Sequence, residues 1–127
     1  MNELMNKDEM TSLELLEQIN LFRQEEYKEK LKNNTLTEAQ IKRGKAVKLE
    51  HKDLLDIIRD EFSEEIGLGK ISPSSYRNSQ NKKQPMFILT LNQAKQVLLR
   101  ESKYVRRAVI QYIEKLEQII NRIWVEP

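Results

Sequence analysis

The pattern of apolar and polar positions predicts a helix near the start of the chain. Apolar residues recur near helical spacing over residues 13–27, and glutamates fill many of the positions between them. Thr11 and Glu14 have the spacing of a capping box, in which each side chain accepts a hydrogen bond from the other residue's backbone N–H. We therefore expect a helix that begins at Thr11 and ends in the polar stretch 32–35.

A short helix and a longer one should follow. Thr37 and Gln40 form a second capping-box pair, and Gly44 suits a helix C-terminus because it lacks a side chain. Few residues of this part are apolar, so we interpret residues 21–48 as a helical insert or arm. Farther along, the apolar positions fall on one face when stepped at about 100° per residue, which predicts a helix over 49–66.

The stretch 71–90 has the composition of a β-hairpin. Two apolar stretches flank the polar and basic segment 78–83 (NSQNKK), and Pro85 favours an edge position because proline cannot donate a hydrogen bond to a neighbouring strand. A third capping box at Thr90 opens another helix, and we expect that helix to break near Glu101.

The last predicted helix carries a seam of apolar residues in alternating steps of four and three positions. This spacing is typical of a helix that packs along a second helix. The seam either docks on the core of its own chain or pairs with a second copy, which would make the protein a homodimer. The dimerisation helix would span residues 102–124. Its contacts would be made by Val105, Val109, Tyr112, Leu116, Ile119 and Ile123.

Chain length and composition narrow the class of protein. A chain of 127 residues fits one domain, which we place at 11–124 after a flexible N-terminus of residues 1–10. No apolar run approaches the roughly 20 residues that cross a bilayer, so we expect a cytoplasmic protein with no membrane partner. The chain has no cysteine and one histidine. We therefore expect no enzymatic activity, no metal and no cofactor.

The net charge of +2 hides a separation of charge along the chain. Residues 70–107 carry nine positive charges against Glu101 alone, so a polyanion should bind this part of the chain. The outward face of helix 49–66 is acidic instead. Such a face is repelled by phosphates, and it favours a basic protein partner or a solvated surface over a cation site. Its carboxylates are Asp53, Asp56, Asp60 and Glu64.

Four segments carry a resemblance to a known family. They are residues 10–15 (MTSLEL), 50–60 (EHKDLLDIIRD), 75–90 (SYRNSQNKKQPMFILT) and 104–113 (YVRRAVIQYI). In this order they resemble the N-terminal domain of the Rha family of phage regulatory proteins. Together with the order of predicted elements, the resemblance implies an α+β fold. It would be a winged helix-turn-helix-like domain with a β-hairpin wing, a helical insert and a long C-terminal helix.

The resemblance also implies a function. The protein would be a phage or prophage-encoded DNA-binding transcriptional regulator, similar to Rha-type antirepressors, that acts in the cytoplasm of a bacterial host. Its partner would be double-stranded DNA. The alternative is a small phage protein that binds and inhibits a host or phage repressor, or a defence factor, through the acidic face of helix 49–66.

The candidate DNA-binding residues form three groups. They are His51, Lys52 and Arg59 on helix 49–66, Arg77, Lys82 and Lys83 at the hairpin tip, and Arg106 and Arg107 near the start of the last helix. The first group would read bases in the major groove, although His51 is also suited to packing at the helix start. The other two groups would bind phosphates, unless they are ordinary solvated surface. We expect the hairpin tip and the arginine pair to converge on one positive surface.

Overall fold

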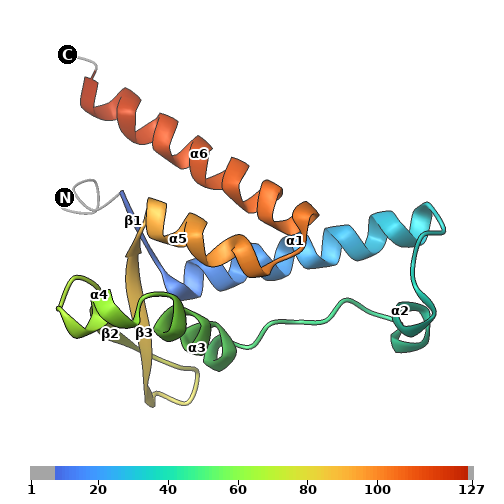
Figure 1. The fold of residues 1–127 in the computed structure, drawn as a ribbon, viewed down its shortest axis with the longest axis horizontal. Helices are drawn as coiled ribbons and strands as arrows, with labels where there is room; N and C mark the ends of the chain where they lie inside the picture. Colours follow the sequence, from blue (N-terminus) through green and yellow to red (C-terminus); the bar gives the residue numbers. More distant parts are fainter. Residues whose placement is uncertain (1–7, 126–127) are drawn as a thin grey trace.

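The computed structural model describes the backbone of residues 8–125 and the side chains of residues 8–121. Helices pack against a small antiparallel sheet, which confirms the predicted α+β class (Figure 1). In chain order the described elements are β1 (Glu9–Thr11), α1 (Ser12–Lys32), α2 (Glu38–Arg43), α3 (His51–Glu61), α4 (Ser63–Gly67), β2 (Ser72–Arg77), β3 (Lys83–Thr90), α5 (Leu91–Val97), a 3-10 turn (Leu98–Arg100) and α6 (Lys103–Val125).

The three predicted capping boxes all form, and they set the starts of α1, α2 and α5. At the first of them the Thr11 hydroxyl accepts from the N–H of Glu14 at 3.1 Å, and the Glu14 carboxylate accepts from the N–H of Thr11 at 2.8 Å. Helix α2 ends at Gly44 as predicted, where φ is +77° and lies in the left-handed region. Each of these boundaries depends on residues a few positions apart, so the sequence alone was enough to find them.

The predicted hairpin is present as β2 and β3, and a third strand joins it. β1 pairs antiparallel with β3, with Met10 opposite Leu89. The predicted flexible N-terminus spans residues 1–10, and the prediction is wrong for Glu9 and Met10. Both residues lie in this strand, and Met10 is buried. Residues 1–7 lie outside the described part of the chain. A strand of three residues is too short for its apolar pattern to be recognised in a sequence.

The edge position predicted for Pro85 is present only locally. β3 is the central strand of the sheet, so the prediction is wrong for the strand as a whole. However, β1 pairs only with residues 88–90 of β3, and Pro85 has a single neighbour, Ser75 of β2. Proline has no N–H to donate to a neighbouring strand. It is tolerated at this point because a strand lies on only one side of it.

The single helix predicted over 49–66 is in fact two. α3 ends at Glu61, and α4 begins at Ser63. Between them lies Phe62, whose φ of −119° departs from helical geometry and whose side chain is buried in the core. The apolar pattern continues across the break because α3 and α4 both face the core, so the pattern could not reveal it.

The core lies between the sheet and the helices α1, α3, α5 and α6. Its fully buried side chains include Leu15, Ile19, Leu54, Ile58, Leu89, Leu98 and Ile113. Tyr112 of the predicted seam packs against this core. Among the described residues, none of the helices combines the length and the apolar character that crossing a bilayer requires.

Helix α6 has a packed half and a projecting half (Figure 1). Val105 and Val109 are buried in the core of their own chain, so the prediction that these two residues contact a second copy is wrong. Farther along, Leu116 is half-buried and Ile119 is 51% exposed. Dimerisation stays a prediction at these two positions, and the side chain of Ile123 lies outside the described residues.

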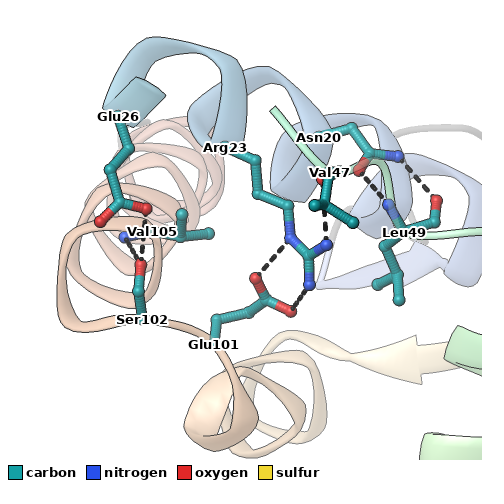
Figure 2. A network of polar contacts seen from close by, with 8 residues as sticks. All are labelled: Asn20, Arg23, Glu26, Val47, Leu49, Glu101, Ser102 and Val105. Atoms are coloured by element: carbon teal, nitrogen blue, oxygen red, sulfur yellow. Dashed lines mark hydrogen bonds and ion pairs between the residues drawn. The ribbon is translucent and has the colours of Figure 1, made fainter. Parts of the chain in front are cut away.

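The predicted insert, residues 21–48, consists of the distal part of α1, the short α2 and the segment that returns to α3. α1 continues without a break to Lys32, so its distal part projects from the body together with α2 (Figure 1). The side chain of Asn20 holds the returning segment at Leu49. Its Nδ2 donates to the Leu49 carbonyl at 3.0 Å, and its Oδ1 accepts from the Leu49 N–H at 2.8 Å (Figure 2).

Candidate nucleic-acid interface

The first turn of α3 lies against the β2–β3 hairpin. The ring of His51, the first residue of α3, meets the ring of Tyr76 on β2 edge to face, with ring centroids 5.8 Å apart. This contact keeps the exposed Lys52 on the part of the molecule that carries the hairpin. The structure therefore brings together two of the three groups of predicted DNA-binding residues, those of α3 and those of the hairpin.

A buried hydroxyl fixes His51 in this position. The Ser12 side chain is fully buried at the start of α1, and its Oγ accepts a hydrogen bond from the N–H of Phe87 in β3 at 3.0 Å. The same Oγ lies 2.9 Å from His51 Nε2. Which of the two groups donates depends on the tautomer of the ring, because the hydroxyl has one proton to give and two lone pairs that accept. Burial lowers the pKa of His51 and so favours the neutral ring.

His51 therefore acts as a tether between α1, α3 and the hairpin. One of its ring nitrogens is occupied by Ser12, and its ring packs on Tyr76. These contacts agree with the packing role that the sequence left open for His51, and its role as a base reader stays a prediction.

Arg59 lies on the same flank of α3 as Lys52, because seven residues make about two helical turns. Its guanidinium carbon is 5.6 Å from the centroid of the Phe87 ring in β3, within the range of a cation–π contact. Its Nη1 is also 3.2 Å from the carboxylate of Asp56. The Arg59 side chain remains 49% exposed, so it is accessible to a ligand that lies along the hairpin side of α3.

The acidic outward face of α3 is partly neutralised. Asp56 pairs with Arg59, and Asp60 pairs with Arg100 in the turn after α5. The two carboxylates are 74% and 70% exposed, so each pair stabilises the fold by at most about 1 kcal/mol. Within the part of the chain that the structure describes, no group of three or more His, Asp or Glu side chains is arranged to hold a metal ion.

The hairpin tip, residues 77–83, has a defined shape. The Asn78 Oδ1 accepts hydrogen bonds from the N–H groups of Gln80 and Lys82, both at 2.9 Å. Asn81 adopts a φ of +61°, and its carbonyl accepts from Arg77 Nη1 at 3.1 Å. Asparagine tolerates such turn geometry better than other residues that carry a side chain. The tip thus holds its basic residues in place through its own polar contacts.

Two cations of the tip face each other across the ladder. Arg77 is the direct partner of Lys83 in the register of β2 and β3. Like charges in directly opposite positions destabilise a sheet. No described carboxylate forms an ion pair with Arg77, Lys82 or Lys83. This end of the sheet therefore carries an uncompensated positive charge that a bound anion would stabilise.

Arg106 and Arg107, the third predicted group, lie apart from the hairpin tip. Arg106 and Arg107 belong to the first turns of α6, and α1 and α5 separate this helix from the hairpin tip (Figure 1). Arg107 lines an open groove between α1 and α6 together with Phe22 and Tyr104. The expectation that the hairpin tip and the arginine pair converge on one surface is therefore wrong, because α1 and α5, which both contact α6 and β3, lie between them.

Sequence reasoning missed two residues of this interface. Ser12 was hidden because a serine beside a helix N-cap resembles an ordinary capping residue, whereas its partners Phe87 and His51 are distant in the sequence. Tyr76 was read as part of the apolar flank of the hairpin, and only the packing of α3 on β2 reveals its contact. No protein-family model matches the chain, and neither a curated protein nor a solved structure matches it.

Proposed function

We propose that the protein is a DNA-binding transcriptional regulator of the Rha antirepressor type, encoded by a phage or prophage. The α3–hairpin surface, defined here as Lys52, Arg59, Arg77, Lys82 and Lys83, contacts the duplex. The observation that carries the proposal is the packing of His51 on Tyr76 at 5.8 Å, which fixes the first turn of α3 beside a hairpin with uncompensated positive charge. A helix followed by a basic hairpin is the arrangement with which winged helices bind a major groove and the neighbouring backbone.

The residues of the α3–hairpin surface have different roles in the proposed contact with DNA. Arg77, Lys82 and Lys83 bind phosphates, because they are grouped at the tip and have no acidic partners in the described chain. Lys52 and Arg59 lie toward the groove, where their donors can reach base edges or phosphates. His51 sets the angle between α3 and the hairpin. Arg106 and Arg107 are left out of the contact with the same duplex.

A paired charge-removal experiment tests this assignment. The Lys82→Ala/Lys83→Ala variant should weaken binding to every duplex alike and reduce the slope of log affinity against log salt by about two, because each phosphate contact releases a counterion. The Arg106→Ala/Arg107→Ala variant removes the same charge from α6 and should leave the slope unchanged. The measurement is fluorescence anisotropy with a labelled mixed-sequence duplex over a salt series. Equal slopes for the two variants would contradict the proposal.

A second candidate function rests on the acidic face of α3. Asp56 is 74% and Asp60 is 70% exposed, and Asp53 is exposed beside them. This face suits a basic partner, such as a host or phage repressor or a defence factor that the protein would inhibit. The Asp53→Asn/Asp56→Asn variant separates the two functions. It should bind DNA more tightly if α3 approaches phosphates, and it should lose a basic partner in a host-lysate pull-down if the acidic face is the docking site.

A further inference from the structure

A polar cavity of about 210 Å³ lies on the part of the molecule that carries the insert. Its walls come from α1, from α2 and the segment that returns from it, and from the corner between α5 and α6. Four cations and two carboxylates line it, which gives the walls a net positive charge. They are Arg23, Lys30, Arg43, Arg100, Glu26 and Glu101. We call this cavity the insert pocket.

Both carboxylates of the insert pocket are already occupied. Glu101 accepts from Arg23 Nε at 2.8 Å and from Arg23 Nη2 at 2.7 Å, and Arg23 Nη1 donates to the carbonyl of Val47 at 3.1 Å (Figure 2). Glu26 accepts from the Ser102 hydroxyl at 2.9 Å, and its other oxygen lies 3.4 Å from Lys30 Nζ. The negative charge in the walls is thus matched by neighbours within the walls.

The remaining cations are not matched in this way. Arg43, the last residue of α2, forms no side-chain hydrogen bond or ion pair with any described residue. Arg100 pairs with Asp60, which is 70% exposed and does not line the pocket. The Lys30 ammonium has a single long contact and two further donors. A ligand in the pocket therefore meets an excess of positive charge and free N–H donors.

The N-terminus of α6 adds to this charge. The Ser102 hydroxyl, which lines the pocket, accepts from the N–H of Val105 at 3.2 Å and so marks the first turn of a 23-residue helix (Figure 2). The partial positive charge at the start of a long helix favours an anion there. This effect supports the cluster of cations, since both act on the same cavity.

We propose that the insert pocket binds a small anion that carries a phosphate group. Arg43 bonds two phosphate oxygens side by side through its planar guanidinium, and Lys30 neutralises a third as a point charge. A volume of about 210 Å³ leaves room for a phosphate together with a small organic group. A phosphate bound to Arg43 and Lys30 joins α2 to α1 and fastens the insert to the body.

The experiment titrates the full chain with two probes, inorganic phosphate and glycerol 3-phosphate, at constant ionic strength. Backbone amide shifts are followed by two-dimensional NMR. We expect saturable shifts confined to residues 26–30, 40–47 and 100–105. Tighter binding of glycerol 3-phosphate would identify a phosphate ester as the ligand, and tighter binding of inorganic phosphate would identify the free ion. Shifts that do not saturate, or that extend equally over the hairpin tip, would overturn the proposal.

A matched pair of variants on α2 completes the test. Arg43→Gln removes the unpaired guanidinium and should weaken binding about tenfold, the effect expected for losing a charge-assisted hydrogen-bond pair. Lys42→Gln removes the same charge from the neighbouring residue, which does not line the pocket, and should leave the affinity unchanged. Both side chains are exposed, so both variants should fold. Equal losses in the two would show that only net charge matters, and would refute a defined site. No DNA is present, so the proposed function stands or falls separately.

Discussion

The Arg23–Glu101 pair and the hairpin tip use the same kinds of cationic side chain in opposite ways. At the α5–α6 corner the Arg23 guanidinium is matched by the Glu101 carboxylate, whose side chain is 6% exposed. At the hairpin tip Arg77 stands opposite Lys83 with no acidic partner among the described residues. The Arg23–Glu101 pair thus contributes to stability, whereas the unpaired cations of the tip lower it and stay available for a ligand. The number of arginines and lysines in a segment therefore does not reveal its role; their partners do.

Breaking the charge pair at the corner should have the largest effect. Glu101→Gln keeps the shape of the side chain but leaves the mostly buried Arg23 without a counter-charge. The two side chains are 24% and 6% exposed, so we expect the free energy of unfolding to fall by about 2 kcal/mol, less than for a fully buried pair that loses one partner. Urea denaturation followed by circular dichroism measures it. Asp56→Asn breaks an exposed pair and should cost no more than about 1 kcal/mol. Similar losses in the two variants would contradict the contrast between buried and exposed pairs.

The stability that the contact between α3 and the hairpin provides should depend on pH through His51. Because burial lowers the pKa of folded His51 from 6.5, the unfolded chain takes up the proton first as the pH falls. The free energy of unfolding should therefore decrease below pH 6.5, level off once the lowered pKa is passed, and be unaffected by His51 above pH 6.5. His51→Gln removes this contribution. The difference in urea midpoint between the two proteins, measured on both sides of pH 6.5, should change with pH. A constant difference would contradict the Ser12–His51 tether.

The smallest effect on stability should be a gain at the hairpin tip. Lys83→Thr removes the like charge opposite Arg77 and should raise the free energy of unfolding by roughly 0.2–1 kcal/mol while it weakens DNA binding. Lys82→Thr is the matched control, because Lys82 lies outside the paired register of β2 and β3. It should weaken DNA binding without the gain in stability. Thermal unfolding and anisotropy on the same samples give both quantities. A loss of stability in Lys83→Thr would show that the tip is optimised for the fold rather than for a ligand.

The sequence revealed the local features of the fold and missed the distant ones. The capping boxes at Thr11, Thr37 and Thr90 depend on neighbours three residues away, and all were found. The hairpin was found because its apolar flanks and polar tip are contiguous. In contrast, strand β1 depends on pairing with residues 88–90, and the break at Phe62 depends on how α3 and α4 fit the core. Neither leaves a local pattern.

The candidate site shows the same limit. The basic residues of the tip could be chosen from the sequence because they are adjacent in it. The role of His51 could not, since its hydroxyl partner Ser12 is 39 residues away. The position of Arg106 and Arg107 depends on the direction in which α6 leaves α5. Counting charges along the sequence does not give this direction, so the prediction that the pair converges with the tip had no geometric basis.

The hold of Asn20 on Leu49 has a consequence for protein engineering. One amide side chain fixes the point where the chain returns to α1, so the stretch between the end of α1 and this point is closed at both ends by the body itself. Lengthening a closed loop costs only about 0.6 kcal/mol for each doubling of its length. A fluorescent tag or a whole foreign domain inserted after Asn33 should therefore leave the sheet undisturbed. The stretch between the end of α1 and Leu49 is thus a suitable place to attach a reporter.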